Sequence, residues 1–167
     1  MQVLFVCTGN ICRSPMAEAL MRRELTARDA GAITVRSAGT GAWDGASASE
    51  GALLVSLEHD LDLSNHRATL LTRELVGETD LILTMARHHR KRVEELGGTG
   101  KTFVLGEYVG RSGAAAEVSD PFGSSLDVYR RTYTEITELV REAVDRLIAA
   151  ARKRQGGDQP PRVGDEG

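Results

Sequence analysis

A cysteine and an arginine stand six positions apart in residues 7–14, which read CTGNICRS. Residues 3–6 form a short apolar run of β-forming side chains, which predicts a buried strand. Pro15 suits the first turn of a helix, where no backbone donor is lost. The segment is therefore predicted to be a loop before a helix N-terminus, where backbone N–H groups can bind an anion. A thiol in such a place ionises readily, and the guanidinium of Arg13 matches phosphate oxygens. This chemistry is phosphoryl transfer through a cysteine.

The alternative for Cys7 is a buried structural cysteine, a common role for this residue type. A lone Cys-x5-Arg spacing also arises by chance in a chain rich in arginine. The strand-to-helix context, the permissive backbone of Gly9 and the placement of Ser14 beside Arg13 favour the functional interpretation. Two cysteines without a nearby histidine pair do not complete a zinc site, so we expect no metal and no cofactor.

The composition indicates one ordinary globular domain. The chain has 167 residues, of which 41% are hydrophobic and 27% charged, enough to bury a sizeable core. A net charge of −3 gives no reason to expect nucleic acid as a partner. No apolar run approaches the roughly 20 residues that span a bilayer, and the N-terminal strand lacks the charged start of a signal peptide.

Both cysteines, Cys7 and Cys12, lie in the one loop. None is left to form a disulfide framework, which argues for a reducing compartment. We therefore expect a cytoplasmic protein, without a membrane partner, that acts as a monomer.

Strand and helix patterns alternate along the chain. The predicted strands are residues 33–37, 80–84 and 102–105, in addition to 3–6, and the predicted helices are residues 16–29, 49–60, 70–76, 86–96 and the long stripe that starts at 126. Such alternation implies right-handed crossovers. The predicted fold is α/β: a single-domain, mainly parallel four-stranded sheet with helices on both faces. Ligands of such sheets bind at the carboxyl ends of the strands, where the cysteine loop falls.

Residues 106–119 are rich in Gly, Ala and Ser and predict an irregular loop. From residue 152 the chain turns to Gln, Gly, Pro and charge, which is typical of a disordered tail. The domain is therefore predicted to span residues 1–151, with residues 152–167 as the tail.

Five segments together resemble one known family: residues 6–18, 37–41, 65–67, 80–85 and 120–123. Their motifs, order and spacing are similar to those of the low-molecular-weight protein tyrosine phosphatases, and the likeness covers nearly everything before the tail. The resemblance implies a Rossmann-like fold of the phosphotyrosine phosphatase I type. It also implies hydrolysis of phosphorylated proteins through a phosphocysteine intermediate, with inorganic phosphate as the product.

The resemblance assigns roles to matching residues. Cys7 would be the nucleophile, Arg13 would hold the phosphoryl oxygens, and Asp120 would protonate the leaving group and later activate water. On its own, Asp120 before Pro121 would be a turn residue; a positioned acid, however, is what a thiolate attack needs. The substrate-binding residues implied by the match are Thr8, Gly9, Asn10, Ile11, Cys12 and Ser14 of the loop, with Trp43 and Phe122 as aromatic walls.

Asn10, Ser14, Ser37 and His66 match the family's supporting hydrogen-bond network. Ser14 is placed to donate to the Cys7 sulfur, and His66 is interpreted as structural rather than as a base. We expect His88 and His89 on a solvated helix face. The resemblance further implies that Cys12 forms a reversible disulfide with Cys7, which would protect the nucleophile from overoxidation.

The phosphorylated residue has two candidates. Two aromatic walls, Trp43 and Phe122, favour the flat ring of phosphotyrosine. Residues 105–125 instead resemble the bacterial protein-arginine phosphatase branch, which carries Phe after Asp-Pro. That branch has Thr where this chain has Ile11, and one branched side chain in a pocket shifts selectivity by about 1–3 kcal/mol. We therefore expect phosphotyrosine, with phosphoarginine as the alternative.

Two rivals from other classes fit less well. A thioredoxin-coupled arsenate reductase shares the cysteine loop, but its relay needs further downstream cysteines, which this chain lacks. A non-catalytic phosphoprotein-binding module would be expected to lack Cys7 or Asp120, and both are present.

Overall fold

A computed structural model describes residues 1–157. At its centre lies a four-stranded, fully parallel sheet of order β2-β1-β3-β4. The strands are β1 (Gln2–Cys7), β2 (Thr34–Gly39), β3 (Leu81–Thr84) and β4 (Thr102–Val104). Because β1 is an inner strand, the loop that follows it leaves from the middle of the carboxyl edge. The predicted fold class is confirmed.

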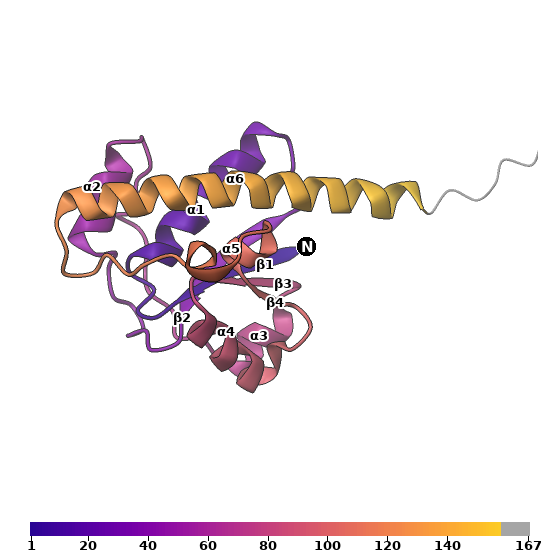
Figure 1. Cartoon of the computed structure of the whole chain (residues 1–167), viewed down its shortest axis with the longest axis horizontal. Coiled ribbons are helices and arrows are strands. Elements are labelled where there is room, and N and C mark those ends of the chain that lie inside the picture. Colours follow the sequence, from indigo (N-terminus) through magenta and orange to yellow (C-terminus); the bar gives the residue numbers. More distant parts are fainter. Residues whose placement is uncertain (158–167) are drawn as a thin grey trace, which may run out of the picture.

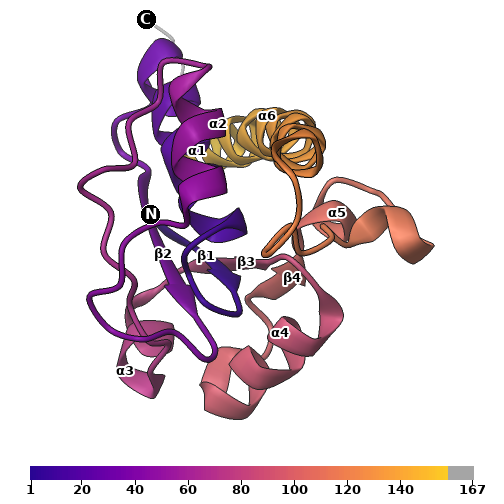
Figure 2. The ribbon, with the colours of Figure 1, turned by 90° about the vertical axis from the view of Figure 1, so that its left-hand side faces the viewer.

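Helices cover both faces of the sheet, as Figures 1 and 2 show. On one face lie α1 (Arg13–Ala27), α2 (Glu50–Leu57) and α6 (Leu126–Gly156); on the other lie α3 (Arg73–Glu78) and α4 (Arg87–Val93). Alternate β1 residues therefore enter two different cores. Val3 and Phe5 pack with α1 and α6, whereas Leu4 and Val6 pack with α3 and α4. This explains why the strand is an unbroken apolar run.

The long helix α6 buries one stripe, which includes Tyr129, Tyr133, Ile136, Val140, Val144 and Leu147. It continues to Gly156, so residues 152–156 are helical rather than part of a disordered tail. The Arg and Lys side chains of these last turns are good helix formers, and the change in composition therefore does not end the helix. The rest of the predicted tail, residues 158–167, lies outside the described residues.

Other elements differ from their predicted ranges for local reasons. The helix predicted at 70–76 begins at Arg73, because Thr72 caps it by accepting from the N–H of Leu75 and Leu70 instead forms a bridge to Gly39. The predicted loop 106–119 contains α5 (Leu105–Tyr108) and a 3-10 turn, Gly113–Ala116. None of the helices within residues 1–157 combines the length and apolar character needed to cross a membrane.

Candidate active site

The loop between β1 and α1 closes around an anion-sized space because its carbonyl groups are bound from outside. The N–H groups of Thr40 and Gly41 donate to the carbonyls of Cys7 and Thr8, both at 2.9 Å, and the N–H of Ser49 donates to that of Ile11 at 2.8 Å. The N–H and C=O of a trans peptide point in opposite directions. The N–H groups of the loop therefore turn inward, as an anion cradle requires.

Gly39, at the end of β2, lets this loop approach. A Cβ placed there would lie 2.8 Å from the backbone nitrogen of Asn10 and would also meet the carbonyl of Thr8. Asn10 itself has a left-handed backbone, with φ of 55°, a conformation that asparagine tolerates better than most residues.

The Cys7 sulfur lies 2.9 Å from Ser14 Oγ. Asn10 Nδ2 donates to Ser14 Oγ at 2.8 Å and to Ser37 Oγ at 2.9 Å. The Ser14 oxygen thus accepts from Asn10, which leaves its own hydrogen available to the sulfur. A sulfur that receives a hydrogen bond is stabilised as thiolate.

Two further contacts hold Asn10 in place. Its carbonyl accepts from His66 Nε2 at 2.7 Å, and its side-chain Oδ1 accepts from the N–H of Thr69 at 2.9 Å. Since a carbonyl only accepts, His66 carries its proton on Nε2. The structure therefore brings together the four residues predicted for the supporting network, Asn10, Ser14, Ser37 and His66.

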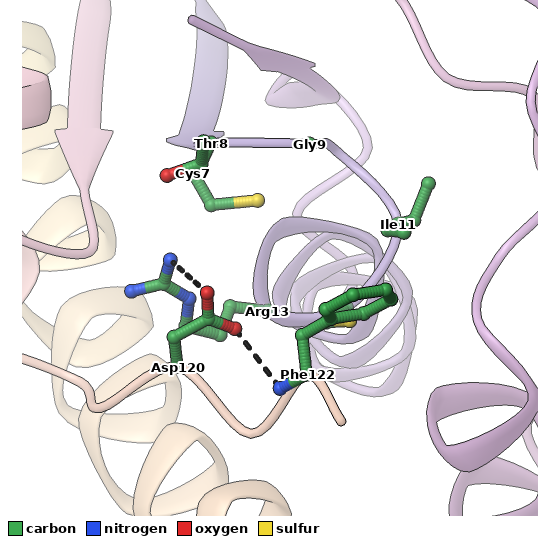
Figure 3. A pocket seen from close by; sticks show the side chains of 8 residues that line it. Cys7, Thr8, Gly9, Ile11, Arg13, Asp120 and Phe122 are labelled. Atoms are coloured by element: carbon green, nitrogen blue, oxygen red, sulfur yellow. Dashed lines mark hydrogen bonds and ion pairs between the residues drawn. The ribbon is translucent and has the colours of Figure 1, made fainter. Parts of the chain in front are cut away.

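Arg13 is buried in the first turn of α1 and reaches across to the loop before α6. Its Nη1 donates to the carbonyl of Val118 at 2.9 Å, and its Nη2 lies 3.7 Å from Asp120 Oδ2. The N–H of Phe122 donates to Asp120 Oδ1 at 3.1 Å. The two contacts of Asp120, drawn as dashed lines in Figure 3, hold a partly exposed carboxylate over the cysteine loop.

A cavity of about 180 Å³ collects these groups. Six of its lining residues come from the cysteine loop and helix start, and the other two are Asp120 and Phe122: the lining is Cys7, Thr8, Gly9, Ile11, Cys12, Arg13, Asp120 and Phe122. Figure 3 shows the Phe122 ring and Ile11 on one side of the cavity, away from the Arg13 guanidinium. The cavity thus combines a sulfur nucleophile, a cationic anion holder, a carboxyl group and an apolar wall.

Trp43 does not line this cavity. Its side chain is 83% exposed, in a loop held by a hydrogen bond from the N–H of Leu70 to Asp44 Oδ1 at 2.7 Å. Of the two aromatic walls predicted for the cavity, the structure therefore has one, Phe122. The polar sequence around Trp43 indicates that its side chain is exposed. It does not indicate the direction of that side chain, which depends on the contacts that hold the loop.

Cys12 lies at the back of the loop. Its Sγ donates to Ser49 Oγ at 3.1 Å and is 3.4 Å from the Tyr129 hydroxyl. Burial raises the pKa of the Cys12 thiol, so it is protonated when it donates. Burial also raises the pKa of Tyr129, with help from the hydrogen bond to Cys12, to about 12. The two cysteines are not disulfide-bonded in the structure.

His89 contradicts its predicted solvated position. It is fully buried, and its Nε2 lies 2.8 Å from Thr8 Oγ1 in the cysteine loop. Burial, together with the positive charges of His88 and Arg13, lowers the pKa of His89 to about 3; the ring is therefore neutral. The basic residues around His88 and His89 in the sequence predict a solvated helix face, and the structure confirms this for His88. The signal overlooked was spacing: His89 follows Ala86 by three positions and precedes Val93 by four, and both are buried.

No group of three or more His, Cys, Asp or Glu side chains within residues 1–157 is arranged to hold a metal ion.

Comparison with known proteins identifies the family. The model of the family described as low molecular weight phosphotyrosine protein phosphatase matches residues 2–155. The protein-arginine-phosphatase of Bacillus subtilis is 40% identical over 149 residues, covering 88% of this chain and 97% of that protein. The low molecular weight protein-tyrosine-phosphatase Wzb of Salmonella typhimurium is 35% identical, covering 91% and 97%.

Solved structures agree with the sequence matches. The YwlE arginine phosphatase, in a C7S mutant with a phosphorylated active-site serine, superposes with a TM-score of 0.85 at 38% identity, covering 91% of this chain and 99% of that one. Wzb from Vibrio vulnificus, in complex with benzylphosphonate, gives 0.77 at 30% identity, covering 87% and 97%. The resemblance stated from the motifs is confirmed: the chain belongs to the low molecular weight phosphotyrosine protein phosphatase family.

Proposed function

We propose that this chain is a cysteine-dependent protein phosphatase that hydrolyses phosphotyrosine through a phosphocysteine intermediate. The observation that carries the proposal is the convergence of the Cys7 sulfur, the Arg13 guanidinium and the Asp120 carboxyl group on one cavity. Its substrates are phosphorylated proteins and its product is inorganic phosphate. We further propose that it acts as a monomer in the cytoplasm, where Cys7 stays reduced.

In the first step, the Cys7 thiolate attacks phosphorus from the side opposite the leaving oxygen. The S–P bond forms as the P–O bond to the substrate breaks, and Asp120 gives its proton to the departing oxygen. Arg13 and the inward N–H groups stabilise the charge on the three equatorial oxygens. Ser14 Oγ, 2.9 Å from the Cys7 sulfur, is placed to donate a hydrogen bond to the nucleophile before attack.

In the second step, Asp120 is a carboxylate and accepts a proton from water. The water oxygen attacks phosphorus, the S–P bond breaks, and the electron pair returns to the Cys7 sulfur. Phosphate leaves, and the thiolate and the protonated acid are restored. The partly exposed position of Asp120 supports this double role, because it meets both leaving group and water at the mouth.

Ile11 and Phe122 support phosphotyrosine as the substrate. Both are apolar and line one side of the cavity, so a flat aromatic ring between phosphate and peptide would be desolvated on the face that meets them. The second candidate is phosphoarginine, and it is supported by the 40% identity to the Bacillus subtilis protein-arginine-phosphatase.

Two measurements test this proposal. Wild type is expected to hydrolyse para-nitrophenyl phosphate at mildly acidic pH, and Cys7→Ser is expected to abolish that turnover; a fully active Cys7→Ser variant would contradict the mechanism. For the substrate, kcat/KM on phosphotyrosine and phosphoarginine peptides is compared. Ile11→Thr is expected to move the ratio toward phosphoarginine by about 10- to 200-fold, the value of one apolar contact. A wild-type preference for phosphoarginine would favour the second candidate.

We also propose the redox role of Cys12. Peroxide converts the Cys7 thiolate to a sulfenic acid, and the Cys12 thiol then attacks that sulfur, forming the disulfide and releasing water. Dithiothreitol is expected to restore activity after peroxide in wild type but not in Cys12→Ser. Equal recovery in both proteins would contradict the role.

A further inference from the structure

A second cavity lies directly beside the catalytic one. It has a volume of about 470 Å³ and is formed by the start of α2, the start of α6 and the loop between Asp120 and α6. Phe122 lines both cavities. We call this second cavity the flanking groove. It plays no part in the chemistry derived above, because neither Cys7, Arg13 nor Asp120 lines it.

The flanking groove exposes apolar side chains from two elements. Leu54 of α2 is 40% exposed and Leu126 of α6 is 37% exposed, and both line the groove together with the exposed ring of Phe122. Single exposed leucines are ordinary on protein surfaces. Three apolar side chains that line one hollow are a different feature, because a contiguous apolar site gains binding free energy when it is covered.

The groove is positioned to meet a bound substrate chain. A phosphorylated side chain in the catalytic cavity leaves its backbone at the mouth, next to Phe122. An extended chain advances about 3.3 Å per residue, so residues one or two positions away reach the other side of the Phe122 ring. Because the two cavities share Phe122, the expected occupant of the flanking groove is the substrate polypeptide itself.

The charge at the groove adds a second feature. Glu50, in the first turn of α2, is exposed and lines the groove, and it has no ion-pair partner within residues 1–157. Arg130 bonds both Glu58, at 2.8 Å, and Asp127, at 2.7 Å, so this group of one positive and two negative side chains offers no spare positive charge. The charged side chain that lines the groove is thus an acid, and it favours a basic residue of the substrate.

The floor of the groove is already fixed without a ligand. Gly51 packs against the ring of Tyr129 so closely that a Cβ at this position would overlap the ring. The Tyr129 hydroxyl is 3.2 Å from Ser49 Oγ and 3.4 Å from Cys12 Sγ. A preformed floor lowers the cost of ordering the site on binding.

We propose that the flanking groove binds the substrate chain beside its phosphorylated residue, seating an apolar side chain between Leu54 and Leu126 and a basic side chain opposite Glu50. The inference rests on the proposed function and extends it. The enzyme then recognises a short sequence, apolar and basic, around the phosphoryl group.

The test compares two phosphopeptides. One has leucine on both sides of the phosphorylated residue and arginine beyond, and the other has serine in place of both leucines. Both are made with phosphotyrosine and with phosphoarginine, and the pair that wild type hydrolyses faster is used. Para-nitrophenyl phosphate, which has no peptide chain, serves as the reference for the catalytic cavity.

Wild type is expected to prefer the leucine peptide by about tenfold in kcat/KM, the order expected for one apolar side chain. Leu54→Ser and Leu126→Ser are expected to remove that preference, and Leu54→Met to retain it. The matched control is Leu57→Ser, since Leu57 is on the same helix and 47% exposed but does not line the groove. A third peptide, with glutamate in place of the arginine, tests the charge: Glu50→Gln is expected to reduce the advantage of arginine over glutamate about twofold or more.

A wild type without preference between the two peptides would overturn the proposal, as would a Leu57→Ser variant that loses as much preference as Leu54→Ser. Absence of wild-type turnover of para-nitrophenyl phosphate would instead contradict the proposed function, so the two failures are distinct.

Discussion

At the scale of single residues, Ser14 links the nucleophile to the interior of the protein. It contacts the Cys7 sulfur on one side and accepts from Asn10 on the other. Ser14→Ala is expected to lower kcat on para-nitrophenyl phosphate about 10- to 100-fold, the range for one hydrogen bond to a charged group. Ser37→Ala is the matched control, because Ser37 accepts from the same Asn10 amide without contact to the sulfur. Equal losses in both variants would show that the effect comes from Asn10 alone.

His89 predicts how stability depends on pH. Its pKa is about 3 in the folded chain against an ordinary 6.5, because it is buried. Between pH 3 and pH 6.5 the unfolded chain binds a proton at His89 that the folded chain does not. The stability that neutral His89 contributes is therefore complete above pH 6.5 and falls as the pH drops from 6.5 toward 3. The free energy of unfolding, measured in urea, is expected to be lower at pH 4.5 than at pH 7 by about 2 kcal/mol on account of His89.

The comparison for this effect is His89→Gln, which removes the titrating group and retains a side chain that can hydrogen-bond Thr8. Its loss of stability between pH 7 and pH 4.5 is expected to be smaller than that of wild type. His88→Gln, on the exposed neighbour, is expected to behave like wild type. If His88→Gln and His89→Gln gave the same pH dependence, the assignment to His89 would be wrong.

At the scale of elements, the end of β2 supports the cysteine loop through Gly39. Gly39→Ala would force the new Cβ against the Asn10 nitrogen and the Thr8 carbonyl. We expect a loss of at least about 2 kcal/mol in the free energy of unfolding, as for overpacking against rigid backbone, together with loss of phosphatase activity. Gly41→Ala, two residues on, has open space around its Cβ. It should change neither thermal unfolding nor turnover, and a similar loss there would contradict the steric explanation.

Most elements could be predicted from sequence because their patterns are local. β1 is an unbroken apolar run because both of its faces are covered, whereas α6 has an apolar stripe because one of its sides is covered. The orientation of Trp43 and the burial of His89 could not be predicted in the same way. They depend on tethers from distant residues, such as Leu70 to Asp44 and Thr8 to His89.

The same distinction applies to the candidate site: contacts within one segment could be predicted from sequence, and contacts between distant segments could not. Cys7, Arg13 and Ser14 share one loop, so their proximity is a consequence of local sequence. Asp120 lies more than a hundred positions away and was identified through family resemblance rather than physics. The side-chain contact of Cys12 with Tyr129 could not be predicted, because it requires the packing of α6 against the loop.

At the scale of the whole molecule, α6 closes one face of the sheet, and its buried residues end before the helix does. Leu147 is its last fully buried residue, and Ile148 packs beside it. A chain ended after Ala150 is expected to keep its unfolding free energy within about 0.5 kcal/mol, since the side chains of residues 151–157 are mostly exposed. A chain ended after Asp145 is expected to lose about 2–5 kcal/mol through the missing core contacts. Equal stability of the two truncated chains would show that the end of α6 contributes nothing to the core.

Within residues 1–157, Phe122 is the one residue that lines both the catalytic cavity and the flanking groove. For inhibitor chemistry, this makes the two hollows neighbouring compartments divided by the width of one phenyl ring. A phosphonate fragment and an aliphatic fragment could then be joined by a linker of a few atoms. Short linkers give millimolar effective concentrations, so two weak fragments would yield one tight ligand. Its selectivity would come from Leu54 and Leu126 rather than from the phosphate loop.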